Sequence, residues 1–160
     1  MNDLAIAQLN VGRAHAPMES PIMAGFVDRL DEINALAEAS PGFIWRLKDE
    51  AGNATAIRAF DDPRVIVNLS MWVSIEELFD FAYRTTHVEL FRGRRSWFEP
   101  YGSPHLVLWW HPANEPPTIE EAKRRLALLT VHGPTPAAFT FKERFAPRQV
   151  LAPERPTEPV

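Results

Sequence analysis

Residues that could do chemistry are concentrated between His87 and Pro100, where one imidazole, three guanidinium groups and large aromatic rings occur within fourteen residues. An imidazole titrates near neutral pH, so it can remove a proton from an acidic phenol or enol, and it can also bind haem iron. Guanidinium groups pair with carboxylates in bidentate geometry. A more ordinary interpretation is that His87 lies beside a helix cap and that the arginines form salt bridges or a solvated surface.

Two chemical roles follow for His87. In the first, His87 is the axial ligand of a bound haem, the only metal we predict, and Arg92 and Arg95 pair with the haem propionates. The chain has no cysteine, which excludes covalent haem attachment. In the second role no cofactor is present, His87 or His111 is a general base, and oxygen reacts directly with the substrate anion.

Aromatic and amide side chains elsewhere could complete such a site by forming its walls and hydrogen bonds. For each tryptophan singly, packing in the core or in a dimer interface is the simpler explanation. The residues that we predict to bind a ligand are Asn10, Asn68, Ser70, Trp72, Phe91, Trp97 and Trp109.

The segment that carries His87 is predicted to be a helix. Thr86 and Glu89 have the spacing of a capping box, and Pro100 ends the helical pattern. Gly93 weakens this prediction by up to about 1 kcal/mol relative to alanine.

Composition excludes several classes of function. With 160 residues, 46% of them hydrophobic, the chain is predicted to form one domain, residues 1–145, followed by a proline-rich disordered tail, residues 146–160. A net charge of -4 gives no support for a nucleic-acid partner. No apolar run is long enough for a membrane span, and no signal peptide is recognisable. We therefore expect a cytoplasmic protein without nucleic-acid or membrane partners.

Alternating apolar residues and capping patterns indicate the elements of the domain. Strands are predicted at residues 4–11, 43–48, 55–60, 64–73, 105–111 and 137–145. Outside the His87 segment, helices are predicted from Ser20 to about Glu38, from Ser74 to about Ala82, and from Thr118 to about Val131.

This order predicts an α+β fold, a ferredoxin-like β-α-β-β-α-β sheet with helices on one face. One strand face is apolar and would contact the helices. The other would carry Gln8, Asn10, Asn68, Ser70 and Trp72, together with Trp109 and His111. That face is too aromatic for water and too polar for a dry core, so we expect two copies to pair through it around a ligand cavity.

Several motifs resemble the DUF3291 family of bacterial proteins, over about residues 4–143. They are residues 42–46, 52–57, 60–63, 67–70, His87 with 92–98, 106–110, 121–126 and 133–141. This family is similar to the dimeric α+β barrel superfamily, which includes cofactor-free antibiotic-biosynthesis monooxygenases, haem-degrading enzymes and other haem proteins. The resemblance implies a homodimeric α+β barrel, and it assigns no catalytic residue to this chain.

The function predicted from the sequence is that of an oxygenase-like enzyme of this barrel type. Its substrate would be an aromatic or hydrophobic small molecule, and haem dependence through His87 stays open. The alternative is a non-catalytic homodimer that binds or senses a small ligand. A third possibility is a structural dimer with a filled interior.

Overall fold

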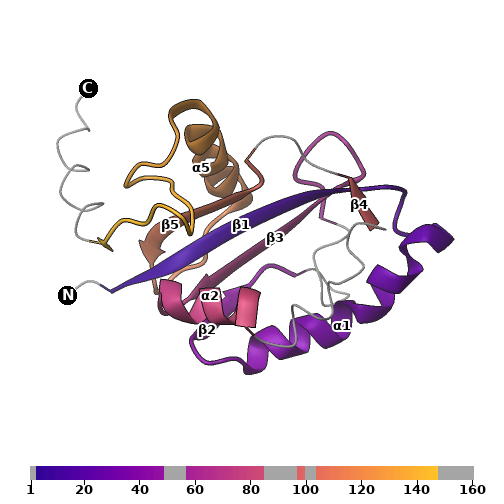
Figure 1. Cartoon of the computed structure of the whole chain (residues 1–160), viewed down its shortest axis with the longest axis horizontal. Coiled ribbons are helices and arrows are strands. Elements are labelled where there is room, and N and C mark those ends of the chain that lie inside the picture. The colour runs from indigo at the N-terminus through magenta and orange to yellow at the C-terminus, as the bar shows by residue number, and fades with distance from the viewer. Residues whose placement is uncertain (1–2, 49–56, 85–96, 100–103, 148–160) are drawn as a thin grey trace.

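The computed structural model describes residues 3–48, 57–84, 97–99 and 104–147 (Figure 1). Its elements, in chain order, are strand β1 (Leu4–Ala14), the 3₁₀ turn η1 (Pro21–Met23), helix α1 (Ala24–Ala39), strands β2 (Phe43–Arg46) and β3 (Val65–Trp72), helix α2 (Ile75–Arg84), strands β4 (Phe98–Glu99) and β5 (Leu106–Pro112), and helix α5 (Ile119–His132).

The strands form one antiparallel sheet in the order β2-β3-β1, with β5 and the short β4 pairing along the free edge of β1. Strand β1 is therefore central, and β3 runs beside it over eight residue pairs, from Ile6 opposite Trp72 to Arg13 opposite Val65. The order β2-β3-β1-β5 is that of a ferredoxin-like unit. The predicted α+β fold class is confirmed.

Serine and threonine side chains cap the starts of η1, α2 and α5, as the sequence predicted. The Ser20 hydroxyl accepts from the Ile22 amide at the start of η1. Ser74 and Thr118 likewise accept from the amides three residues ahead, Glu77 and Glu121. Each bond satisfies an amide that has no partner within its own helix. The helix starts predicted at Ser74 and Thr118 are correct, whereas Ser20 caps the 3₁₀ turn η1 and α1 follows from Ala24.

Helices lie on both faces of the sheet (Figure 1). Ala5, Ala7, Leu9 and Val11 of β1 pack in one apolar core with residues of α5. The alternate residues of β1 face α1 and α2, since Ile6 packs with residues of both helices and Ala14 with the first turn of α1.

The predicted polar and aromatic face of β3 was therefore placed on the wrong side of the protomer. We expected Asn68, Ser70 and Trp72 on a sheet face without helices, and they lie on the face that α1 and α2 flank. The apolar face that we assigned to all the helices is covered by α5. The alternation along each strand was correct, but it does not say which helix covers which face.

Three further predictions differ from the structure. Residues 57–60 of the predicted strand 55–60 are not in a strand. The predicted strand 137–145 makes only isolated bridges, at Ala138 and Phe139. The predicted helix up to Pro100 is wrong at Phe98, which belongs to β4. Residues 86–96 of this predicted helix, its end at Pro100, and most of the predicted tail lie outside the described residues.

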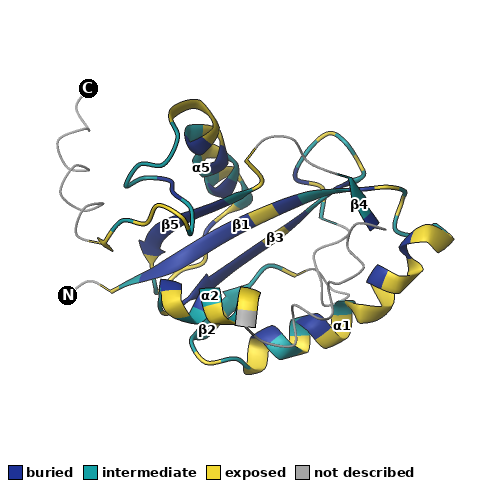
Figure 2. Cartoon of the chain, in the orientation of Figure 1, coloured by how far each residue is buried: buried dark blue, intermediate teal, exposed yellow. Residues whose placement is uncertain are grey.

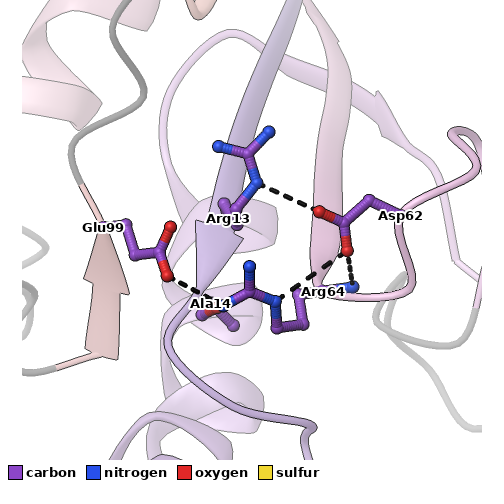
Figure 3. Close-up of polar contacts among 5 residues, drawn as sticks. All are labelled: Arg13, Ala14, Asp62, Arg64 and Glu99. Atoms are coloured by element: carbon purple, nitrogen blue, oxygen red, sulfur yellow. Dashed lines mark hydrogen bonds and ion pairs between the residues drawn. The ribbon is translucent and has the colours of Figure 1, made fainter.

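A group of charged side chains fixes β4 to the end of the sheet (Figure 3). Arg64 donates to the Glu99 carboxylate at 2.8 Å and to the Ala14 carbonyl at 3.3 Å. Asp62 pairs with Arg13 at 3.1 Å. A hydrogen bond from the Arg64 backbone amide is the main reason why the pKa of the Asp62 carboxyl is lowered. These contacts join β1, β3 and β4, and so position Trp97 beside them.

Candidate functional site

A row of polar side chains crosses the middle of the sheet on the face that α1 and α2 flank. Gln8 lies opposite Ser70, and Asn10 lies opposite Asn68, as neighbouring cross-strand pairs of β1 and β3. We call these four residues the polar row. Directly opposite residues of an antiparallel pair have Cβ atoms about 5 Å apart, so their short side chains can meet.

Hydrogen bonds connect three members of the row to Trp72. The Gln8 side-chain nitrogen donates to Asn68 Oδ1 at 2.6 Å and to Ser70 Oγ at 2.8 Å. It also lies 3.2 Å from the main-chain oxygen of Asn68. The Trp72 indole donates to the same Ser70 oxygen at 2.9 Å. Ser70 Oγ thus accepts from two donors.

Apolar clusters adjoin the row at both ends. At one end Trp72 packs with Ile6, Phe43 and Phe81, and its ring stacks on that of Phe81 with centroids 5.1 Å apart. At the other end Trp97 packs with residues of α1 and η1. Helix α1 supplies residues to both clusters. The sheet face therefore passes from aromatic, through polar, to aromatic again.

Solvent reaches the row between these clusters. Asn10 and Asn68 are exposed, although both lie in the interior of long strands, and Figure 2 shows an exposed band between buried stretches of β1. Ser70 and Gln8 are buried, at 6% and 5% exposed. The row thus has a buried side that is hydrogen-bonded and a side that a small molecule could contact. His105 is near that open side, with its Nδ1 3.4 Å from Asn10 Oδ1.

Trp97 forms the wall at the end of the row nearest β4. A Cβ atom added to Gly25 of α1 would lie 3.1 Å from the indole ring, so glycine permits this close approach. The Trp97 ring also lies 5.7 Å from that of Phe26, centroid to centroid. Trp97 and Trp72 are thus both on the side of the sheet that carries the row.

Trp109 and His111 lie on the opposite face of the sheet, beneath α5. The register places Trp109 opposite Ala7 and His111 opposite Ala5, both on the apolar face of β1. The expectation that these two residues share a face with Asn68 and Ser70 is wrong, because β5 pairs with β1 in a register that places both of them on the apolar side. The two groups cannot form one site across a sheet.

The environment of His111 keeps its imidazole neutral. Burial is the main cause of the lowered pKa of His111, and the Arg125 guanidinium also lowers it, while Glu121 and Glu115 act in the other direction. Within the described part of the chain, His111 Nε2 and Trp109 Nε1 are buried without a hydrogen-bond partner. Arg125 lies over the Trp109 ring, 5.9 Å from its centroid, and donates to Glu121 at 2.8 Å.

Four residues of the predicted site cannot be placed. His87, Phe91, Arg92 and Arg95 lie outside the described residues, so the roles proposed for them stay predictions. Among the residues that are described, no group of three or more His, Cys, Asp or Glu side chains could hold a metal ion.

Gln8 was missed as a site residue by reasoning from the sequence. Its signal is a glutamine at an inward position, between Ile6 and Asn10 on the same strand face. A buried side-chain amide needs hydrogen-bond partners. The described partners of Gln8 all lie in β3, about sixty residues later in the sequence. The sequence alone does not identify those partners.

The chain belongs to the family of the domain of unknown function DUF3291, whose model matches residues 5–155. No curated protein matches the sequence. The resemblance expected from the sequence motifs is confirmed at the level of the family.

Several solved structures are similar to this chain at low sequence identity. PA3566 from Pseudomonas aeruginosa is 11% identical, with a TM-score of 0.41, over 70% of this chain and 96% of that one. SnoaB, a cofactor-independent oxygenase from Streptomyces nogalater, is 14% identical, with a TM-score of 0.43, over 71% and 95%. A candidate antibiotic biosynthesis monooxygenase from Nitrosomonas europaea is 11% identical, with a TM-score of 0.45, over 74% and 97%.

None of the helices in the described residues combines the length and the apolar character that crossing a bilayer requires.

Proposed function

We propose that this protein binds an aromatic or hydrophobic small molecule at the polar row and acts on it as an oxygenase-like enzyme. The observation that carries the proposal is the exposed pair Asn10 and Asn68, beside a buried hydrogen-bond network and between two aromatic clusters. Ligand sites typically combine apolar walls with a few placed polar groups. Trp72 and Trp97 would contact the ring system of the ligand, and the row would contact its polar atoms.

The catalytic part of the proposal assigns a general base to the histidine predicted from the sequence, His87. A base would remove a proton from an acidic CH₂ or phenol group of the substrate, and the resulting carbanion or phenolate would react with oxygen. For a substrate R₂CH₂ the balance is R₂CH₂ + O₂ → R₂C=O + H₂O. The substrate supplies all four electrons, so no further reductant is needed.

His111 is a second base in chemical terms, because its imidazole is neutral and Nε2 is unpartnered among the described residues. It lies beneath α5, on the other face from the row. If His111 has a catalytic role, the substrate must enter on the α5 side, where Trp109 would contact it. The ligand-binding geometry favours the row over the α5 side, and His87, which lies outside the described residues, stays the base predicted from the sequence.

Haem binding through His87, Arg92 and Arg95 remains a proposal from the sequence. In the described part of the chain, His105 is an imidazole near the row, with its Nδ1 3.4 Å from Asn10 Oδ1, and His111 lies on the opposite face. Adding ferric haem to the purified protein tests this directly. A Soret band at one haem per chain that disappears in His87→Ala would support haem ligation, and an unchanged spectrum would discard it.

A homodimer also remains a proposal, based on the family resemblance. Among the described residues, α5 buries one face of the sheet, and on the other face α1 and α2 flank the row, of which Asn10 and Asn68 are exposed. Two chains that met through the apolar face would have to displace α5. Light scattering of the protein as it elutes from a size-exclusion column measures its molar mass and so distinguishes a monomer from a dimer.

The alternative function is ligand binding or sensing without catalysis. The chemistry of the row favours this alternative. The row consists of three side-chain amides and one hydroxyl, and the Trp72 indole lies beside it. None of these groups titrates near neutral pH. Such groups can orient a ligand but cannot remove its proton.

Oxygen consumption separates the two functions. Purified protein is mixed with a panel of phenolic and polycyclic CH-acidic compounds, and dissolved oxygen and product are followed without added cofactor. Turnover that is lost in His87→Ala and kept in His132→Ala, an exposed histidine at the end of α5, supports the enzyme. Ligands that raise the melting temperature without consuming oxygen support the binding protein instead.

A further inference from the structure

We infer that Phe98, whose ring packs on Gly12, is a specificity-determining residue that limits the length of the ligand bound at the polar row. This inference rests on the proposed function, and it deepens that proposal by naming the residue at which the ligand site ends. It follows from the order of the cross-strand pairs on this face of the sheet and from the contacts of the Phe98 ring. Neither residue was predicted from the sequence to bind a ligand.

The pairs of β1 and β3 that share a face with the row come in a definite order. Ile6 opposite Trp72 is first, the two pairs of the polar row follow, and Gly12 opposite Ile66 is next. Alternate residues of a strand lie on one face, with Cα atoms about 7 Å apart. The row therefore lies between the Trp72 pair and the Gly12 pair, which are roughly 20 Å apart along the strands from Cα to Cα.

The open part of the row is at the Gly12 end. The Trp72 indole donates to Ser70 Oγ at 2.9 Å, and Ser70 is 6% exposed, so the Trp72 end of the row is closed. Asn10 and Asn68, which are exposed, form the pair next to Gly12 on this face. A ligand that contacts the exposed pair must therefore end at, or extend over, the position of Gly12.

The ring of Phe98 occupies the space over Gly12. A Cβ atom added to Gly12 would lie 3.2 Å from the ring. Strand β4 pairs Phe98 with Ala14, the next residue of β1 on the same face. The ring also makes an edge contact with that of Phe26 in α1, with centroids 5.0 Å apart. Phe98 thus fills the space between the sheet and α1 beside the exposed pair.

The absence of a side chain at position 12 is required by space and not by the backbone. Among the described glycines, Gly42 and Gly133 are the ones with a positive φ, so the backbone at Gly12 does not demand glycine. Glycine weakens the interior of a strand, and it often occurs there because another group approaches the backbone closely. At Gly12 that group is the Phe98 ring. Gly12 is therefore a positioning residue for Phe98.

Neighbouring contacts hold Phe98 in place. Phe98 and Glu99 pair with Ala14 and Arg13 of β1, and the Glu99 carboxylate accepts from Arg64 at 2.8 Å. A ring held by strand pairing, an ion pair and an aromatic neighbour forms a firm wall, so a longer ligand would have to displace it. In an apolar pocket, a small difference in ligand size changes affinity by about tenfold or more.

Two probes of different length test the inference. Naphthalene-2-sulfonate and anthracene-2-sulfonate carry the same charge, and the second is longer by one fused ring. Calorimetry gives the dissociation constants of both probes for the wild-type protein and for Phe98→Ala, which removes the wall. We expect the affinity for the longer probe, relative to that for the shorter one, to rise by about tenfold in Phe98→Ala. Charge repulsion cancels in this ratio because both probes carry one sulfonate.

Phe60→Ala is the matched control. Phe60 is also half-buried, and it packs against the core beneath α5, on the opposite face of the sheet. The same truncation at this position should leave the ratio of the two affinities unchanged. An equal rise in Phe60→Ala would overturn the inference, because a general loosening of the fold would then account for the rise.

A double variant tests the role of the space over Gly12. In Gly12→Leu with Phe98→Ala, an apolar side chain from β1 refills the space that the ring leaves. The ratio of the two affinities should then return toward its wild-type value. A ratio that stays at the Phe98→Ala value in the folded double variant would show that the limit is not set over Gly12, and it would overturn the inference.

The remaining outcomes separate this inference from the proposed function. If the wild-type protein binds the probes and Phe98→Ala leaves their ratio unchanged, the inference is overturned and the ligand site stays in place. Binding of neither probe to any of these proteins counts against both. If Phe98→Ala does not fold, as judged by circular dichroism, Phe98→Leu takes its place and should shift the ratio in the same direction. An unchanged ratio in folded Phe98→Leu overturns the inference.

Discussion

The two faces of the sheet are made by adjacent residues of the same strands, and they differ in what their polar atoms contact. On the α5 face, Ala5, Ala7, Leu9 and Val11 are at most 3% exposed within one apolar core. On the face that α1 and α2 flank, Gln8 and Asn10 lie between two apolar clusters, and Asn10 is exposed. One face supplies the main packing of the fold, and the other interrupts its packing where a ligand could bind.

The buried polar atoms of the two faces also differ. In the polar row the Gln8 nitrogen has acceptors and the Ser70 oxygen has donors. On the α5 face the described residues leave Trp109 Nε1 and His111 Nε2 without a partner, and such atoms cost free energy. Among the described residues, Gln8, Ser70 and Trp72 are thus hydrogen-bonded on the open face, whereas two buried nitrogens on the closed face have no partner.

The largest expected difference between the two faces is in the stability lost when the neighbouring residues Leu9 and Asn10 are each replaced by alanine. Leu9→Ala removes methyl groups from a residue 2% exposed, and it should lower the free energy of unfolding by about 2–5 kcal/mol. Asn10→Ala changes an exposed side chain and should alter stability by at most about 0.5 kcal/mol. Urea unfolding followed by tryptophan fluorescence gives both values. Equal losses would show that the faces do not differ in this way.

A second substitution tests whether the row is a real network. Ser70→Ala leaves the buried Trp72 indole without its acceptor and should cost about 1–3 kcal/mol. Removing the donor as well, in the double variant Ser70→Ala with Trp72→Phe, should cost less than the sum of the two single changes. Chemical denaturation of the four proteins measures this coupling. Strict additivity would mean that the hydrogen bond contributes little.

A third substitution asks whether α5 unfolds together with the sheet. Thr118 caps α5 by accepting from the Glu121 amide at 3.0 Å, and Thr118→Ala should cost about 1 kcal/mol. Hydrogen exchange measured by mass spectrometry should show faster exchange in α5 and in β5 together. The control Thr130→Ala removes the hydroxyl of an exposed residue in the same helix, one that donates to the Leu126 carbonyl and does not cap the helix start. Faster exchange confined to α5 would show that the helix opens independently of the sheet it covers.

Local features of the sequence predicted most of this fold. The alternation from Arg64 to Val73 fixed β3, and serine or threonine caps fixed the starts of the helices. These signals are short-range, because a strand face or a helix cap is decided by residues two to four positions apart. Asn68, Ser70 and Trp72 were placed on one face for the same reason.

What the sequence could not supply was the long-range pairing. Trp109 was assigned to the wrong face because the register of β5 relative to β1 depends on contacts between residues about a hundred positions apart. The partners of Gln8 and the position of α5 depend on equally distant contacts. The sequence therefore predicted which residues are polar and inward, but not which of them meet.

The smallest expected effect concerns pH, and it tests the α5 face alone. Folding lowers the pKa of His111 below its value of 6.5 in the unfolded chain, chiefly through burial. Below pH 6.5 the unfolded chain therefore binds more protons at this site than the folded protein does, and stability must fall as the pH decreases toward the folded pKa. His111→Gln removes this titration, so the loss of stability between pH 7.5 and 5.5 should be smaller in the variant than in the wild type.

Urea midpoints at the two pH values give the comparison, with His132→Gln as a control for the loss of any imidazole. Equal losses in wild type and His111→Gln would mean that His111 takes up its proton without disturbing α5. The apolar face would then contain enough water near His111 to solvate a charge, and the contrast between a closed face and an open one would no longer hold.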